Sequence, residues 1–171
     1  MNLVKKDDYY TPKWVWEEIA PFLKKNGVKR IYEPFNNILQ DTSLNSRRTL
    51  EFLDFEVLKT RPYNPLTEEN SFFTNIIDPD SYDAIVSNIP FSKKKWIIEH
   101  LICLDKPFCI LIPPYAICAK YFKKFKNQKD LGIIIPSNRI DFKTAENPNQ
   151  KSRWEGLWVT YKMGGELEWL K

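Results

Sequence analysis

The residues best suited to chemistry stand together in one short turn, Asn88-Ile89-Pro90-Phe91, here called the NIPF turn. The side-chain oxygen of Asn88 and the backbone carbonyl of Ile89 offer two hydrogen-bond acceptors close together. Pro90 stiffens the turn, and the ring of Phe91 can stack on a flat heterocycle. Such a turn suits the exocyclic amino group of an adenine that has left its base stack. Asn and Pro also mark turns for local reasons, so an ordinary strand-to-helix turn is the alternative interpretation.

The segments around the NIPF turn are predicted to alternate between helix and strand. Apolar residues recur at helical spacing after Pro12, and this helix should end near Asn26-Gly27. Further helices are predicted over 46–53, 93–104 and 114–125. The helix over 93–104 should present one apolar face, formed by Trp96, Ile97, His100, Leu101 and Leu104. The predicted strands are short and apolar, and they cover 28–32, 55–58, 82–87, 108–112, 131–135 and 154–163.

Strands that alternate with helices predict an α/β fold with a mostly parallel, doubly wound sheet. The apolar runs are continuous rather than alternating, as expected for strands covered on both faces. Segments 133–135 and 157–161 can pair as a terminal antiparallel hairpin. Ligands of such folds bind beyond the carboxyl ends of the strands. The candidate site is therefore formed by the loops after Tyr32, Leu58, Ser87 and Ile112.

The NIPF turn resembles the (D/N)PP(Y/F) motif of amino-group methyltransferases, and the chain as a whole resembles the viral and phage adenine-N6 DNA methyltransferase-like proteins. Segment 9–12 (YYTP) is similar to the N-terminal motif of that family, and Glu33-Pro34-Phe35 to the start of its cofactor loop. Segments 136–142 and 157–162 resemble its late strands. The resemblance implies a Rossmann-like S-adenosylmethionine methyltransferase fold, with residues 1–171 forming one domain.

The resemblance also implies a role for each matching residue. The NIPF turn would be catalytic: Asn88 and the carbonyl of Ile89 would accept hydrogen bonds from the adenine amino group, and Phe91 would stack on the base. Ile89 replaces the first proline of the motif, which keeps the carbonyl and makes the turn less rigid. The residues implied to bind the cofactor are Tyr10, Thr11, Pro12, Glu33, Pro34, Phe35, Asn37 and Phe72.

The cofactor loop departs from the pattern of that family, which reads EPFxGxG. Asn37 and Leu39 stand where the glycines are expected, and no glycine occurs between residues 27 and 132. Glycine permits positive φ and a close approach of the backbone to the cofactor. Lys59 and Asn70 stand where acidic residues are expected. Each lost contact costs about 1–3 kcal/mol, against about 8 kcal/mol for micromolar affinity. We therefore expect weak or no S-adenosylmethionine binding and lost or very weak methyl transfer.

Three functions remain open on the sequence alone. The first is an active enzyme that methylates adenine N6 in nucleic acid. The second is a catalytically inactive module that binds nucleic acid or a protein, in the latter case through a patch with Trp154, Trp158 or Trp169. The third is methylation of an amide nitrogen in a protein, because glutamine methyltransferases use a related NPPY turn. The basic run 93–95, formed by Lys93, Lys94 and Lys95, favours nucleic acid, although such runs are more often solvated helix faces.

Composition, charge and cysteine spacing argue against several other classes of protein. The net charge of +4 is compatible with nucleic acid as a partner. The three cysteines lie in apolar stretches without CxxC spacing, so no metal site is expected. Their odd number and the absence of a signal peptide predict an intracellular protein, in the cytoplasm or nucleus, with a viral origin as one option. No apolar run approaches the roughly 20 residues that cross a bilayer, so no membrane partner is expected.

Overall fold

The computed structural model describes residues 10–35, 45–59, 72–73, 77–125, 128–142, 155–164 and 167–169. Three α-helices are present in these ranges: α1 (Lys13–Lys25), α2 (Ser46–Phe52) and α3 (Lys94–Leu104). The strands are β1 (Arg30–Tyr32), β2 (Glu56–Val57), β3 (Ala84–Asn88), β4 (Phe108–Ile112), β5 (Leu131–Ile135), β6 (Leu157–Tyr161) and β7 (Leu167–Trp169). Short 3₁₀ helices are η3 (Phe91–Lys93), η4 (Pro114–Cys118), η5 (Lys120–Lys124) and η6 (Gln128–Asp130).

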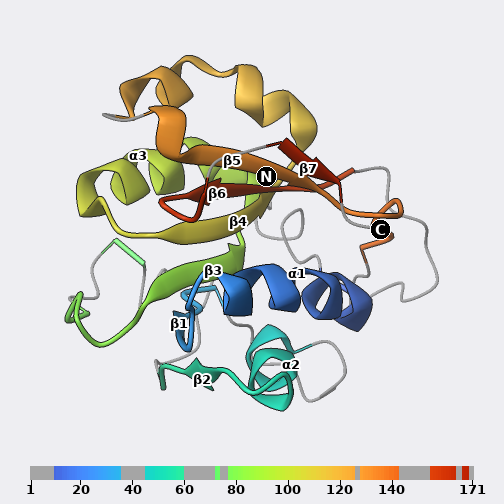
Figure 1. The fold of residues 1–171 in the computed structure, drawn as a ribbon. Helices are drawn as coiled ribbons and strands as arrows, with labels where there is room; N and C mark the ends of the chain where they lie inside the picture. Colours follow the sequence, from blue (N-terminus) through green and yellow to red (C-terminus); the bar gives the residue numbers. More distant parts are fainter. Residues whose placement is uncertain are drawn as a thin grey trace, which may run out of the picture.

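The strands form one sheet in the order β2-β1-β3-β4-β6-β5-β7 (Figure 1). Every neighbouring pair is parallel except those of β6, which runs antiparallel to both β4 and β5. The predicted α/β class, the mostly parallel sheet and the antiparallel pairing of segments 133–135 and 157–161 are therefore confirmed, with Ile133 opposite Val159. The prediction that this pair ends the sheet was wrong, because β7 continues it beside β5, with Ile133 opposite Leu167.

The strand order reverses at β1. After β1 the chain moves outward to β2, then returns to place β3 on the other side of β1. Open α/β sheets bind ligands at such a reversal, beyond the carboxyl ends of the two strands. Helix α1 precedes β1 and runs antiparallel to it, so the start of α1 lies at the same end of the sheet (Figure 1). The topology thus brings residues 10–12, the end of β1 and the end of β3 to one edge.

Two apolar layers hold the sheet in place. Helices α1 and α2 cover one face, where Trp16 meets Trp158 edge-on at a centroid distance of 5.4 Å. Helix α3, η4 and η5 cover the other face, where Phe108 stacks on Tyr161 at 5.5 Å. Burial on both sides explains the continuous apolar runs in the strands. The fully buried Trp158 cannot belong to an exposed partner-binding patch.

Two helix predictions need correction. Residues 114–125 form the 3₁₀ helices η4 and η5 rather than one α-helix, and extended Ala119 separates them. The buried positions Ala116, Phe122 and Phe125 differ by multiples of three, which matches the 3₁₀ period rather than 3.6. Trp96 does not share the buried face of α3, since it is 66% exposed. Residues 61–70 and 143–153 lie outside the described residues.

Candidate functional site

Glu33 is a buried carboxylic acid at the carboxyl end of β1. Only 3% of the residue is exposed. Its Oε1 atom accepts hydrogen bonds from the Ser87 hydroxyl at 2.5 Å and from the Phe35 backbone N–H at 3.0 Å. Its Oε2 atom is buried without a hydrogen-bond partner among the described residues. Burial raises the pKa of Glu33 to about 8, and the hydrogen bonds from Ser87, Phe35 and Ser46 offset this only in part. The structure thus keeps an acid in a place where its charged form is costly.

The NIPF turn leaves the end of β3, the strand beside β1. Asn88 is half-buried and lies opposite Leu111 of β4. Ile89 points into the core, which anchors the turn. Pro90 precedes η3, and the half-buried ring of Phe91 meets the ring of Phe142 edge-on at 5.9 Å. Apolar contacts of Ile89 and Phe91 therefore fix the turn. Asn88 and Phe91 are half-buried at the carboxyl edge, and the Oδ1 atom of Asn88 is itself buried.

Gly156 lies against Phe142, the residue whose ring contacts Phe91. A Cβ atom added at Gly156 would lie 3.2 Å from Ile140 Cδ1 and from Phe142 Cζ, and 3.3 Å from Leu111 Cδ1. The absence of a side chain lets segment 140–142 lie close to the end of β4. The late segment that resembles the family thus holds Phe142 against the NIPF turn.

Tyr10, Thr11 and Pro12 lie at the start of α1. Tyr10 and Thr11 are buried, and Pro12 is the N-cap residue, with an extended φ/ψ of −57° and 147°. The Thr11 Oγ1 atom is buried and has no hydrogen-bond partner among the described residues. Buried polar atoms in folded proteins nearly always have a partner. Thr11 and Glu33 therefore contribute two unsatisfied oxygens to the same end of the sheet.

Two of the predicted cofactor residues pack into an aromatic cluster. Phe72 is 2% exposed and its ring contacts Phe35 at 5.4 Å and His100 at 4.8 Å. Pro34 is buried beside Phe35. Burial lowers the pKa of His100, which is partly buried. Asn37, the remaining predicted cofactor residue, lies outside the described residues.

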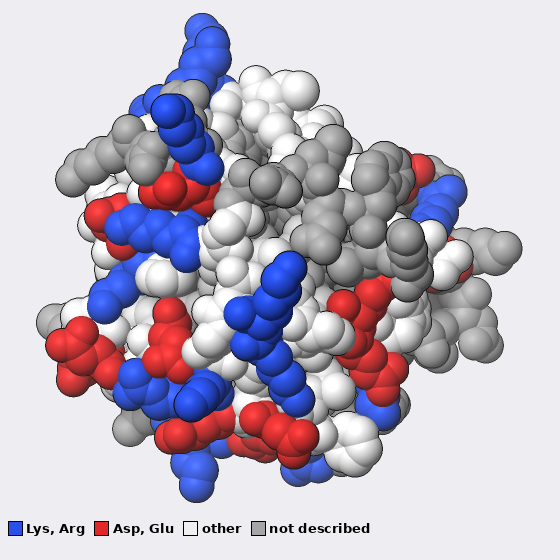
Figure 2. Space-filling model, in the orientation of Figure 1, with Lys and Arg blue, Asp and Glu red and all other residues white. Residues whose placement is uncertain are grey.

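The basic run after the NIPF turn is ordered in part by the turn itself. The Lys94 ammonium group donates a hydrogen bond to the Phe91 carbonyl at 3.0 Å and lies 5.3 Å from the centroid of the Tyr115 ring. Lys93 is partly buried and Lys95 is exposed. On the described part of the α1 and α2 face, basic and acidic side chains alternate rather than forming a continuous basic surface (Figure 2).

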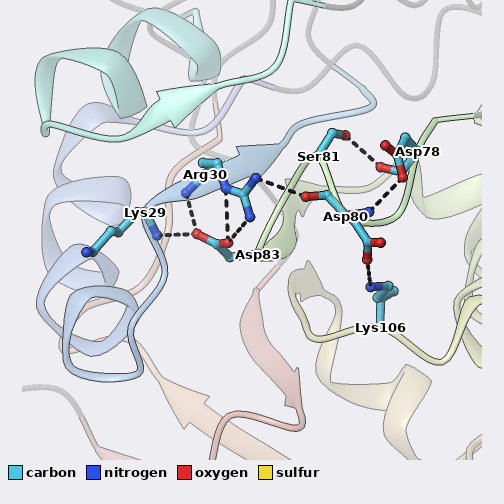
Figure 3. Close-up of polar contacts among 7 residues, drawn as sticks. All are labelled: Lys29, Arg30, Asp78, Asp80, Ser81, Asp83 and Lys106. Atoms are coloured by element: carbon cyan, nitrogen blue, oxygen red, sulfur yellow. Dashed lines mark hydrogen bonds and ion pairs between the residues drawn. The ribbon is translucent and has the colours of Figure 1, made fainter.

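The opposite end of the sheet carries a second acid, Asp83, in a different setting (Figure 3). Its carboxylate accepts hydrogen bonds from the Lys29 and Arg30 backbone N–H groups at 2.9 and 2.8 Å, and from the Arg30 side chain at 2.8 and 3.2 Å. Burial alone would raise the pKa of Asp83, but these hydrogen bonds and the Arg30 charge hold it below its usual value. Asp83 therefore ties β1 to β3 and has no capacity left for a ligand.

Sequence reasoning missed Ser87 and Ser46 as partners of Glu33. Ser87 donates the shortest hydrogen bond to Glu33, and hydrogen bonding from Ser46 also favours the charged acid. The only sequence signal for Ser87 was a small polar residue in the last position of an apolar run. Nothing in the local sequence of Ser46 indicated a contact with Glu33.

Among the described residues, no group of three or more His, Cys, Asp or Glu side chains could hold a metal ion. No described helix has both the length and the apolar character needed to cross a membrane.

No protein-family model matches this chain, and no curated protein matches its sequence. One similar solved structure is described as the modification subunit of a type I restriction enzyme from Vibrio vulnificus YJ016. The two chains are 13% identical and superpose with a TM-score of 0.44, over 92% of this chain and 45% of the other. This chain thus spans less than half the length of that subunit.

Proposed function

We propose that this chain is an adenine-N6 methyltransferase-like domain that acts on or binds nucleic acid. In this proposal it has a Rossmann-like S-adenosylmethionine methyltransferase fold, and its methyl transfer is lost or very weak. The observation that carries the proposal is the hydrogen bond from Ser87 to Glu33. Asn88 follows Ser87 directly. This hydrogen bond therefore places the acid expected to bind the cofactor next to the strand end that carries the amide expected to bind the base.

The unsatisfied oxygens support a site for the polar end of the cofactor. The methionine part of S-adenosylmethionine carries an ammonium group, and Glu33 Oε2 and Thr11 Oγ1 are buried acceptors without a partner among the described residues. A cation beside Glu33 would favour its charged form and remove the cost of burying it. Bound cofactor would supply the electrophilic methyl group. Glu33, held by Ser87, would orient that end of the molecule.

The NIPF turn would hold the base. Asn88 Oδ1 and the Ile89 carbonyl would accept the two amino hydrogens and direct the nitrogen lone pair toward the methyl donor. Phe91 would stack on the ring, in an orientation fixed by Phe142. The base must be extruded from a duplex or already be unpaired. The half-buried Asn88 and Phe91 at the carboxyl edge are the residues of the turn that would meet it.

Weak activity follows from the missing glycines and from Phe72. The loop after Phe35 lacks the glycines that allow close approach of a backbone to a cofactor. Phe72, implied to hold the cofactor, is enclosed by other rings. These two features favour a second candidate, an inactive module of the same fold that serves as a structural or protein-interaction partner.

Calorimetric titration with S-adenosylmethionine tests the proposal. We expect a dissociation constant near 1 mM, about 4 kcal/mol, and further weakening in Glu33→Gln. The control is Glu56→Gln, which changes an exposed glutamate on β2 and should leave binding unchanged. Binding that Glu33→Gln leaves unaltered would contradict this cofactor site, and no heat at any concentration would favour the inactive module.

Methyl transfer to an adenine-containing oligonucleotide tests the base-binding role. Any transfer should disappear in Asn88→Ala, because the amino group loses one of its two acceptors. Transfer that survives this change at the wild-type rate would exclude Asn88 from the site. Transfer to a glutamine-containing peptide instead would identify an amide methyltransferase.

A further inference from the structure

Two large aromatic side chains are exposed just beyond the NIPF turn. Trp96 is 66% exposed in the first turn of α3, and Tyr115 is 55% exposed in η4. Because burying such rings is favourable, large exposed rings close to a candidate site are candidates for contact with a partner.

Each of these rings is paired with a lysine. The Lys94 Nζ atom lies 5.3 Å from the centroid of Tyr115, and the Lys95 Nζ atom lies 5.7 Å from that of Trp96. A cation over an aromatic ring is a favourable contact that also holds the long lysine chain in place. The result is two ordered units, each with an accessible ring and an ammonium group.

Both units lie at the edge that carries the NIPF turn. The same Lys94 ammonium group donates to the Phe91 carbonyl at 3.0 Å, which joins Tyr115 to the turn. Tyr115 follows β4, whose Leu111 is paired with Asn88 at the end of β3. Trp96 belongs to α3, which begins directly after η3, the 3₁₀ helix that starts at Phe91.

A ring beside an ammonium group matches the repeating unit of a single strand of nucleic acid. Each nucleotide presents one flat base and one phosphate, and unpaired bases stack on aromatic side chains whatever their identity. In a duplex the base faces are covered by neighbouring bases, which leaves the phosphates, the sugars and the base edges in the grooves for contact, but no face for stacking. Exposed rings therefore select unpaired strands, while lysines alone would not.

We propose that Tyr115 with Lys94, and Trp96 with Lys95, bind single-stranded nucleic acid next to the NIPF turn. The rings stack on bases that flank the target, and the lysines contact the adjoining phosphates. This inference rests on the proposed function in one respect, the binding of the target base by the NIPF turn. Binding of the strand itself needs neither cofactor nor methyl transfer.

Fluorescence anisotropy with a labelled strand of about 20 nucleotides tests this surface. The full chain is titrated with single-stranded DNA, single-stranded RNA and duplex DNA of one sequence. We expect one or both single strands to bind at least tenfold more tightly than the duplex, and comparison of the two single strands shows whether the sugar matters. A duplex that binds as well as the single strands, or no binding by any of the three, would overturn the proposal.

Aromatic variants locate the binding surface. Trp96→Ala and Tyr115→Ala should each weaken single-strand binding about fivefold or more, as expected from the loss of a stacked base. Trp96→Phe and Tyr115→Phe should keep most of it. The matched control is Phe52→Ala, which removes another exposed ring with a lysine over it, on the α1 and α2 face of the sheet. Equal effects of all three alanine variants, or no effect of Trp96→Ala and Tyr115→Ala, would also overturn the proposal.

A charge variant separates the phosphate contacts from the cofactor site. Lys94→Gln should reduce the slope of log affinity against log salt concentration by about one phosphate contact. An unchanged slope would remove Lys94 from the surface. Because strand binding is measured without cofactor, the strand-binding proposal can fail while S-adenosylmethionine still binds, and the cofactor site can fail while the strand still binds.

Discussion

The two ends of the mostly parallel sheet place a carboxylic acid in opposite environments. At the amino end, Asp83 accepts four hydrogen bonds from Lys29 and Arg30, and its pKa is held below the usual value against the effect of burial. At the carboxyl end, burial raises the pKa of Glu33 to about 8, and one of its oxygens has no partner among the described residues. The satisfied acid joins two strands. The unsatisfied acid destabilises the free chain and is the better candidate for contact with a ligand.

The largest expected effect is the pH dependence that Glu33 confers on stability. The folded chain keeps a proton on Glu33 that the unfolded chain releases above 4.5, the ordinary pKa of the group. The free energy of unfolding should therefore fall as the pH rises from 4.5 to about 8, by up to about 1.4 kcal/mol per pH unit. Urea unfolding at several pH values measures this slope. Glu33→Gln cannot titrate and should flatten it, so an unchanged slope would show that Glu33 ionises normally.

A smaller effect is expected at the amino end. Asp83→Ala removes the acceptor for two backbone N–H groups and for Arg30, and should cost about 2–3 kcal/mol of unfolding free energy. Arg30→Gln keeps the backbone contacts and should cost about 1 kcal/mol or less, since the ion pair is partly exposed. Neither change should alter cofactor binding by the protein that remains folded. A loss of cofactor affinity in Asp83→Ala below its unfolding temperature would break the distinction between the two ends.

The smallest expected effects come from two matched glycine substitutions. Gly156→Ala crowds Ile140 and Phe142 and should cost about 1–2 kcal/mol. Gly27→Ala at the amino end meets no atom within 4 Å but has a φ of +77°, and should cost a similar amount, about 1 kcal/mol. Only Gly156→Ala should also weaken base or strand binding, because Phe142 positions Phe91. Thermal melting and anisotropy together measure both effects, and equal binding by the two variants would argue against this positioning.

The sequence predicted the parts of the fold that depend on local pattern. Segments 108–112 and 131–135 are continuous apolar runs, and the structure begins and ends β4 and β5 at those residues. Helix α1 ends at Lys25 with Asn26 as its C-cap residue, close to the predicted end near Asn26-Gly27. Strand β7 was missed because Leu167–Trp169 is too short to show a strand pattern.

The site was less predictable because it depends on contacts between distant segments. Glu33 and Ser87 are 54 residues apart, and only the pairing of β1 with β3 brings them together. The exposure of Trp96 could not be read from helical spacing, which placed it with the apolar residues of α3. Aromatic residues are usually in the core, so composition alone does not identify those that remain at the surface.

The most direct test is a carbon-13 NMR titration of the side-chain carboxyl groups, with and without S-adenosylmethionine. We predict that Glu33 titrates near 8 in the free chain and at a lower pH with cofactor present, while Asp83 titrates below its usual range in both samples. A Glu33 carboxyl that titrates near 4.5 and does not respond to the cofactor would contradict the account.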